Sequence, residues 1–403
     1  MGRTVAMAIE MESSAPAAGF FDSAPMAVSR TEGWRYFREP GEVYQRDGLW
    51  FITTARAVRF VHQHPEIFSS AHAFDNLGSP VPLIPLEIDP PEHVRYRRML
   101  DPMFAPRVIN QIDDELRQQV RDIIGRFIDR GRCEIMADLA ELYPTQVILT
   151  MFGLPLADRD KFHRWVRLMV EASGATAGTA PTPEQAEGAN ALFSYLREYI
   201  QAKRANPTDD ALSTVLAMSG DDAWSDDEVL GLCFMFALAG LDTVTGAIGF
   251  VMHALATRPD LRQRIAAEPG LTAPFIEEVL RLESPAPFSP RIVVSDVDVF
   301  GTTIPAGSYI FMLLSTANRD EREVPDDIDL DHADRGHVSF GAGIHRCVGS
   351  HLARRELRLV VEEFNKMIPD YEIDGDATPV IHWPSGTFHL TSLPLRFPPG
   401  GTA

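Results

Sequence analysis

The chain of 403 residues has only three cysteines, Cys133, Cys233 and Cys347, and they form no Cys-x-x-Cys pair. Their scarcity argues against a disulfide framework and a zinc site built from cysteines, and favours the reducing cytoplasm. Positive charge is also scarce: 37 Lys and Arg stand against 57 Asp and Glu, a formal net charge of −20. That balance argues against a partner that is a nucleic acid or an anionic membrane.

The N-terminal stretch MGRTVAMAIEMESSAPAAGFF lacks a basic start followed by a long apolar run, so we expect no signal peptide or membrane anchor. Internal repeats and low-complexity tracts are absent as well. The composition, 45% hydrophobic and 23% charged, is that of a globular protein with a large core. We expect one soluble, monomeric domain over residues 1–403, with residues 1–30 as an arm that need not be ordered.

Helical periodicity dominates residues 92–285. Strand patterns occur at residues 43–53, around an Asp-Gly turn, and again at residues 292–314 and 379–397. Mostly helix with small sheets towards the two ends of the sequence predicts a mainly α protein of the α+β class.

Two stretches have loop composition. Residues 173–183 are small and turn-forming, while residues 72–91 are rich in proline yet apolar. Two interpretations remain open: ordinary surface crossovers, or lids over a buried apolar site.

A long helix is predicted from the capping box Ser225-Asp226-Asp227-Glu228 to about Thr257. Its 32 residues span about 48 Å. Asp242 is the only charged residue between Val229 and Met252, and 13 residues precede it in that run. Because this run is short and small residues crowd the centre, a buried central helix is favoured over a membrane span.

Asp242 and Thr243 follow Ala239-Gly240, where small side chains leave the helix backbone least covered. One interpretation is structural: the backbone or an arginine binds the buried Asp242 carboxylate, and the Thr243 hydroxyl donates a hydrogen bond to the carbonyl four residues earlier. The other is a proton-delivery pair beside a ligand, in which Thr243 donates a hydrogen bond and Asp242 relays protons.

Cys347 lies in the stretch FGAGIHRCVG, directly before an amphipathic helical pattern. A helix N-terminus and neighbouring positive charge favour the thiolate. Glycines on both sides let the backbone approach a bulky neighbour. Partners for a zinc site are lacking, whereas haem iron needs only one proximal ligand from the protein. The alternative is a small buried hydrophobic residue in a turn.

The pattern Phe-Gly-x-Gly-x-His-x-Cys-x-Gly at residues 340–349 is similar to the haem-binding loop of the cytochrome P-450 family. Residues 239–243 resemble the family's oxygen-activating stretch, residues 278–281 its Glu-x-x-Arg pair, and residues 89–97 the start of its haem-flanking helix. The residues of these motifs most resemble those of the soluble bacterial members of the family, of the camphor-hydroxylase type. The resemblance implies a triangular, mainly helical domain with small β-sheets.

The resemblance also implies roles by position. Cys347 would be the thiolate ligand of haem b, with Phe340 packed beneath the haem. Thr243 and Asp242 would manage proton delivery during oxygen activation, and Glu278 and Arg281 would form a structural ion pair. The other residues implied to contact the haem are four cationic groups for the propionates and four small residues: His93, Arg97, Arg291 and His345, then Ala239, Gly240, Gly341 and Gly349.

One departure concerns the segment before the haem loop. The family's Pro-Asp-Arg-Phe is Pro325-Asp326-Asp327-Ile328 here, so the arginine that completes the Glu/Arg network is missing. His332 and Arg335 are the candidates to replace it.

The implied activity is monooxygenation: one atom of O2 enters an apolar substrate and the other is reduced to water. The substrate expected is compact and hydrophobic, terpenoid-like in preference to a steroid or fatty acid. Two rival functions are a peroxide-driven haem-thiolate enzyme and a non-catalytic haem sensor. The residues expected by position to line the substrate pocket are Phe74, Met235, Leu238, Phe288 and Phe388.

Electrons require a separate donor, because no flavin or nicotinamide domain is recognisable. Residues 93–107 and residues 340–358 each carry four arginines and one acid in a chain of net charge −20. The family architecture would place both on the face near Cys347, where they would attract an acidic ferredoxin served by its own reductase. Helix salt bridges within the protein are the alternative use of these arginines.

Overall fold

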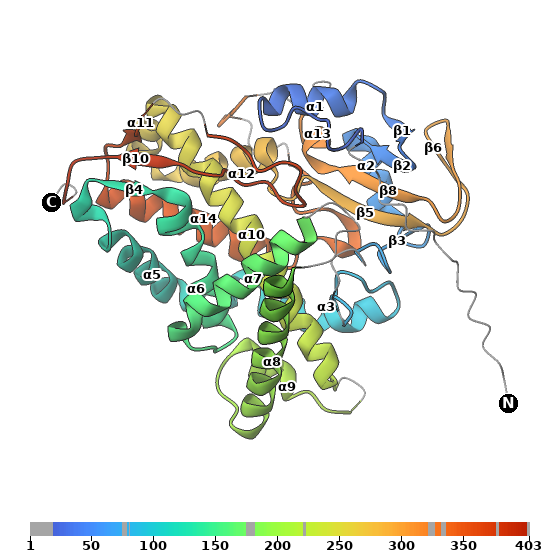
Figure 1. Ribbon diagram of the computed structural model, residues 1–403, viewed down its shortest axis with the longest axis horizontal. Coiled ribbons are helices and arrows are strands. Elements are labelled where there is room, and N and C mark those ends of the chain that lie inside the picture. The colour runs from blue at the N-terminus through green and yellow to red at the C-terminus, as the bar shows by residue number, and fades with distance from the viewer. Residues whose placement is uncertain are drawn as a thin grey trace.

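Helices make up most of the chain, and most of the strands gather at one corner of a roughly triangular molecule (Figure 1). The structure is a computed structural model, and it describes residues 19–74, 79, 81–174, 182–220, 223–320, 327–331, 336–375 and 379–400. The prediction of a mainly α protein with small sheets is confirmed.

The bounds of the elements follow chain order. The helices are α1 Arg30–Arg38, α2 Ala55–Gln63, α3 Glu92–Met103, α4 Pro106–Ile109, α5 Asp113–Gly125, α6 Leu142–Met151, α7 Arg159–Gly174, α8 Pro183–Ala205, α9 Ala211–Leu216, α10 Asp226–Thr257, α11 Pro259–Ala267, α12 Thr272–Glu283, α13 Leu314–Asn318 and α14 Ser350–Met367. The strands are β1 Val43–Arg46, β2 Leu49–Ile52, β3 Phe68–Ser69, β4 Arg132–Glu134, β5 Phe288–Val293, β6 Val297–Val299, β7 Thr302–Ile304, β8 Tyr309–Leu313, β9 Glu372–Ile373 and β10 Pro394–Arg396.

The largest sheet has five strands in the order β1-β2-β8-β5-β3. Its β1–β2 hairpin confirms the predicted turn, since Asp47 and Gly48 take the positive φ values, 50° and 78°, that such a turn requires. The sheet differs from the prediction of separate strand regions. Parallel pairing of β2 with β8, with Trp50 opposite Ile310, joins strands from both parts of the chain.

Helix α10 runs as predicted and forms the centre of the helical part (Figure 1). Both halves of the capping box are present: the Glu228 N–H donates to the Ser225 hydroxyl, and the Ser225 N–H donates to the Glu228 carboxylate. Among the described helices, α10 alone is long and apolar enough to cross a membrane, but 67% of its apolar window is buried within the protein. It is a core helix.

The structure describes the last part of the expected N-terminal arm, residues 1–30. Residues 19–30 pack on the domain, where Phe20 stacks on Tyr36 at 4.6 Å between ring centroids and Met26 is buried. The physical reason is that these apolar side chains gain from burial, which outweighs the cost of ordering the segment.

The two loop predictions are tested only in part. Residues 175–181, 75–78 and 80 lie outside the described chain. The remainder of the 72–91 loop is anchored rather than free: Leu83 and Ile84 are buried, and a Cβ at Gly231 of α10 would lie 2.3 Å from the Pro82 carbonyl oxygen.

Candidate functional site

The middle of α10 carries a partly exposed stripe within an otherwise buried helix. Leu241 and residues 244–252 are buried, whereas the residues of the stripe are not. A spacing of three to four residues keeps most of the stripe on one face of the helix, so this face borders accessible space inside the fold. The residues of the stripe are Met235, Leu238, Ala239, Gly240, Asp242 and Thr243.

The Cys347 loop is shaped by two glycines and a main-chain hydrogen bond. Gly341 and Gly343 have φ values of 66° and 64°, which glycine adopts readily. The Cys347 N–H donates to the Phe340 carbonyl over 2.8 Å, and the guanidinium of Arg354 lies 4.4 Å from the Phe340 ring centroid. Cys347 is accessible to solvent as a residue.

The protein around Cys347 acts on its sulfur in two directions. The surrounding protein atoms desolvate the thiol and raise its pKa, while the Gly349 N–H and the charges of Arg97 and Arg354 lower it. The helix and positive charge therefore act as predicted, but desolvation outweighs them.

Three imidazoles near this loop have buried, unpartnered nitrogens. Within the described chain, the Nε2 atoms of His62, His93 and His345 are all buried without a hydrogen-bond partner. His93 and His345 lie 4.3 Å apart, ring centroid to ring centroid. Burial, reinforced by neighbouring positive charge, lowers the pKa of His62 to about 3 and of His93 to about 4. Unsatisfied buried donors grouped in this way fit a missing acceptor.

Two arginines adjoin these histidines. Arg291 on β5 is buried, and desolvation lowers its pKa to about 10. Its charge lowers the pKa of both His62 and His345, so it faces the same region. Arg97 on α3 ties that helix to the Cys347 loop by donating to the Arg346 carbonyl over 2.6 Å.

His62 did not stand out in the sequence. It lies on α2, about 280 residues before the Cys347 loop, and no motif marks it. Its approach depends on glycine: a Cβ at Gly343 would lie 2.3 Å from the His62 carbonyl oxygen. We define the cationic cluster as His62, His93, Arg97, Arg291 and His345.

Glu278 and Arg281 form a buried ion pair on α12, with Arg281 Nη2 2.8 Å from Glu278 Oε2. Main-chain groups contact both members of this pair. Arg281 donates to the Asp327 carbonyl over 2.9 Å, and the Asp329 N–H donates to Glu278 over 2.9 Å. The Asp327 side chain is exposed, and the candidates His332 and Arg335 lie outside the described residues.

Asp242 and Thr243 make different contacts. The Thr243 hydroxyl donates to the Ala239 carbonyl over 2.7 Å, which is the i−4 bond of the structural interpretation. Asp242 accepts a hydrogen bond from the Thr387 hydroxyl. Burial raises the pKa of Asp242 to about 6, an effect that the charge of His382 opposes. A carboxyl group with this pKa can exchange protons near neutral pH.

The expected pocket residues divide into two groups. Phe74, Met235, Leu238 and Phe288 are half-buried hydrophobic residues packed against the main core. Phe388 does not fit the prediction: it is fully buried, its ring centroid 5.2 Å from that of Trp34, because its hairpin packs tightly on α10.

Gly240 also has a packing role, and its predicted contact with haem stays a prediction. A Cβ there would lie 2.9 Å from Cδ1 of Ile148, so the glycine permits α6 to pack on α10.

The residues present fit haem. In the described chain, no group of three or more His, Cys, Asp or Glu is placed to hold a metal ion, so a metal at Cys347 would take one ligand from the protein. That is the donor set haem iron uses. The three imidazoles of the cationic cluster supply unpaired nitrogens, and Arg291 supplies buried positive charge, for the two propionates, while Arg97 already pairs with Asp101.

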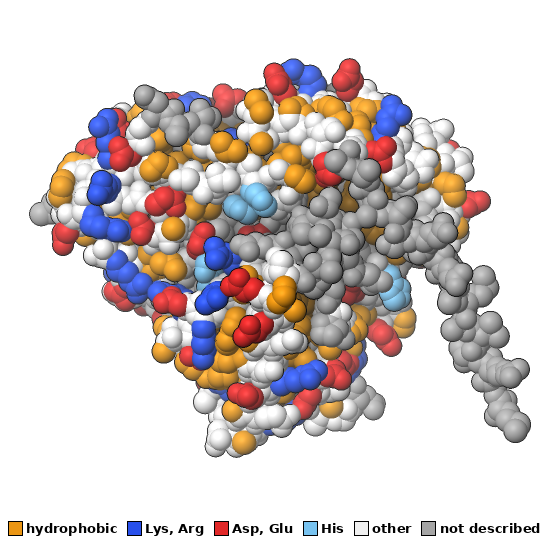
Figure 2. All heavy atoms as spheres, viewed as in Figure 1, with side chains coloured by type: hydrophobic (Ala, Val, Ile, Leu, Met, Phe, Trp, Pro, Cys, Tyr) orange, Lys and Arg blue, Asp and Glu red, His pale blue; other side chains and the backbone are white. Residues whose placement is uncertain are grey.

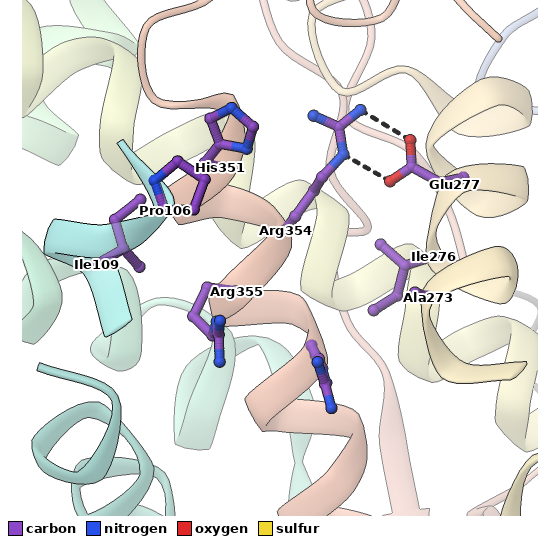
Figure 3. Close-up of a pocket in the computed structure, with 9 residues that line it drawn as sticks. Pro106, Ile109, Ala273, Ile276, Glu277, His351, Arg354 and Arg355 are labelled. Carbon is purple, nitrogen blue, oxygen red and sulfur yellow. Dashed lines mark hydrogen bonds and ion pairs between the residues drawn. The ribbon is translucent and has the colours of Figure 1, made fainter. Parts of the chain in front are cut away.

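Beyond the Cys347 loop, α4, α12 and α14 border a surface pocket (Figure 3). Figure 3 shows Arg354 paired with Glu277, at 2.6 Å between Nε and Oε1. Arg355 pairs with Asp113 and Arg358 with Glu362, so helix salt bridges use much of this positive charge. Two exposed arginines, Arg107 and Arg346, form no ion pair within the part of the chain that the structure describes.

Comparison with known proteins gives the family. Residues 49–364 match the family Cytochrome P-450. The vitamin D(3) 25-hydroxylase of Pseudonocardia autotrophica is 33% identical over 325 residues, 78% of this chain and 79% of that protein. The mycinamicin IV hydroxylase/epoxidase of Micromonospora griseorubida is 33% identical over 322 residues, 78% of each chain.

Solved structures agree. The open form of cytochrome P-450 EryK from S. erythraea superposes with a TM-score of 0.83 at 28% identity, covering 94% of this chain and 99% of that chain. The family uses haem with a cysteine thiolate ligand to the iron. The chain therefore belongs to the cytochrome P-450 family and is a monooxygenase of the bacterial type.

Proposed function

We propose that this enzyme hydroxylates a compact hydrophobic substrate with electrons from an acidic ferredoxin and its separate reductase. The observations that carry the proposal are the accessible apolar stripe of α10 and the Cys347 loop with its cationic cluster. One face offers an apolar surface with a single carboxyl group, and the other offers a thiol and an anion site. The protein is proposed to be one monomeric cytoplasmic domain.

When bound, haem supplies the oxygen chemistry. Cys347 is proposed to bind its iron, the cationic cluster to hold its propionates, and Phe340 to shield the sulfur. His62 is added to the cationic residues predicted from sequence because its Nε2 has the same unpaired, buried state as those of His93 and His345.

Thr243 and Asp242 are proposed to deliver protons on the substrate side. Thr243 holds its hydroxyl at the accessible face while donating to Ala239, and the Asp242 carboxyl, whose pKa burial raises to about 6, can take up and release a proton near neutral pH. A peroxide-driven enzyme would need neither residue, which favours the O2-dependent reaction.

The substrate proposed is terpenoid-like, with a steroid or fatty acid as the alternative. Met235, Leu238, Phe74 and Phe288 present sulfur, aliphatic and aromatic surface, which favours a rigid apolar molecule over a charged one.

A spin-state titration tests the substrate class. Camphor, testosterone, vitamin D(3) and palmitoleic acid are added to the ferric enzyme, and displacement of the iron-bound water is followed by absorption. We expect camphor, the terpenoid, to give the largest shift to high spin. A larger shift with testosterone or with palmitoleic acid would contradict the terpenoid-like assignment.

Replacement of Thr243 by alanine tests the proton-delivery role. With the probe that gives the largest spin shift, we expect Thr243→Ala to consume electrons at a similar rate but to form much less product per electron pair. Undiminished, well-coupled turnover would contradict the role.

A further inference from the structure

A hairpin near the C-terminus touches α10 one helical turn after Asp242. The Thr391 N–H donates to the Val380 carbonyl over 2.8 Å and closes the hairpin. A Cβ at Gly246 would lie 2.1 Å from the Phe388 carbonyl oxygen, so the hairpin backbone rests directly on the helix. This contact fixes the side chains of residues 380–391 relative to Asp242.

Two histidines of the hairpin lead from the surface to Asp242. The Nδ1 of His389 lies 4.0 Å from Oδ1 of Asp242, and this nitrogen is buried without a hydrogen-bond partner in the described residues. The ring centroid of His389 lies 5.6 Å from that of His382, with an angle of 31° between the planes. His382 is exposed. An exposed imidazole, a half-buried imidazole and a mostly buried carboxyl group therefore follow one another inward.

The groups that face Asp242 from other elements are few. Thr387 donates to Oδ2 of the carboxylate. Glu141, the residue directly before α6, acts on it only through charge: burial raises the pKa of Glu141, the charge of Arg167 opposes this, and Asp242 adds to it. Nε2 of His163 on α7 lies 3.7 Å from Oε2 of Glu141. This acid–histidine pair is the alternative route by which a proton from solvent would approach Asp242.

We propose that His382 and His389 form a proton relay from solvent to the carboxyl group of Asp242. The relay rests on the proposed function, in which Asp242 delivers protons. The hairpin is favoured over the Glu141–His163 pair because His389 and Thr387 contact the Asp242 carboxylate, whereas Glu141 only repels it.

The reaction fixes what the relay must supply. Monooxygenation of a substrate R–H consumes one O2, two electrons and two protons and yields R–OH and water. The electrons come from the ferredoxin, so the protein must supply the protons. His382 takes a proton from solvent and passes it to His389, which donates from Nδ1 to Oδ1 of Asp242. The protonated carboxyl group then releases it at the α10 face beside Thr243, and the relay resets with the next proton.

The test compares haem-loaded wild type with His389→Phe, His382→Phe and His163→Phe. Phenylalanine keeps the ring but removes both nitrogens. His163→Phe is the matched control, since the side chains of His163 and His389 are 22% and 26% exposed and each lies beside a carboxylate. His389→Asn is the second variant should the phenylalanine disturb the hairpin.

Three quantities are measured with the camphor or testosterone probe: product per electron pair, the solvent deuterium isotope effect and the pH profile of turnover. The unchanged absorption spectrum of the reduced, CO-bound variants serves as the check that the haem site is intact.

We expect His389→Phe and His389→Asn to lower product formation about tenfold and to raise the solvent isotope effect, with about a twofold loss in His382→Phe because water reaches His389 directly. His163→Phe should match wild type. Wild-type values in both His389 variants, or the loss in His163→Phe instead, would overturn the relay and leave the proposed function standing. A wild type that forms no product from O2 and electrons would overturn the proposed function and the relay with it.

Discussion

Asp242 is a carboxyl group that the fold keeps mostly away from water. Burial raises its pKa from 3.8 to about 6, so between these pH values the folded protein holds a proton that the unfolded chain releases. Asp242 therefore does not destabilise the fold below pH 3.8, where it is protonated in both states. Its destabilising effect grows as the pH rises and is complete above about pH 6. The cost is on the order of 2–3 kcal/mol. Carboxyl groups held at such a cost are typical of functional sites.

Asp242→Asn should remove that cost. We expect the variant to melt at a higher temperature than wild type above pH 6, with the advantage shrinking as pH falls towards 4, because wild-type Asp242 is then protonated. Thermal denaturation followed by circular dichroism from pH 4 to 8 measures the difference. The control is Asp370→Asn, which alters an exposed carboxylate. An advantage of equal size at every pH would contradict a buried, titrating Asp242.

His62 gives a second prediction at the scale of the residue. If its unpaired Nε2 donates to a haem propionate, His62→Leu should lose haem to apomyoglobin about tenfold faster, since a hydrogen bond to a charged group contributes roughly 1.5 kcal/mol or more. His62→Gln keeps a donor and should retain most of the affinity. Equal transfer rates in wild type and His62→Leu would show that His62 does not contact the haem.

At the scale of the element, α10 is held by backbone contacts that only glycine permits. Glycine to alanine in a helix normally stabilises by up to about 1 kcal/mol. At Gly246 the added methyl group would collide with the Phe388 carbonyl, so we expect Gly246→Ala to lower the melting temperature instead. Gly125 in α5 has nothing within 4 Å of an added Cβ, so Gly125→Ala should be neutral or stabilising. Equal effects of the two variants would contradict tight packing of the hairpin on α10.

Local patterns account for the elements that could be predicted from the sequence. The capping box at Ser225 and the turn at Asp47 and Gly48 involve neighbours in the chain, and both occur as expected. What could not be predicted depends on contacts between distant segments. The pairing of β2 with β8, and the approach of His62 to Gly343, have no local signature.

The site follows the same division. The resemblance in four short motifs was enough to locate the Cys347 loop, Asp242 and the Glu278–Arg281 pair. It was not enough to show that the main chain at Asp327 and Asp329 contacts this pair, since main-chain groups leave no trace in residue identity.

At the scale of the whole molecule, the net charge of −20 would repel an acidic partner unless positive charge is concentrated where the two proteins meet. Figure 2 shows acidic and basic side chains interspersed over the visible face. Most arginines near the Cys347 loop are neutralised by acids of the protein itself, which leaves Arg346 and Arg107 as the exposed, unpaired cations in that part of the described chain.

Arg346→Ala should therefore slow electron transfer from an acidic ferredoxin several-fold at low ionic strength, with the difference vanishing at high salt. Stopped-flow reduction of the ferric enzyme measures the rate. The control is Arg126→Ala. Arg126 is also exposed, and it lies about 220 residues before this loop in the sequence. A salt-independent rate, or equal slowing in both variants, would place the docking surface elsewhere.

The proposed haem-thiolate chemistry depends most of all on Cys347 as the ligand of the haem iron. The direct measurement is the absorption spectrum of the purified enzyme, reduced and saturated with CO, for wild type and Cys347→His. Wild type is predicted to show the strongly red-shifted Soret band of thiolate-bound haem, and Cys347→His is predicted to lose it. A band of the imidazole type in wild type, or a red-shifted band that survives in Cys347→His, would contradict the assignment of Cys347.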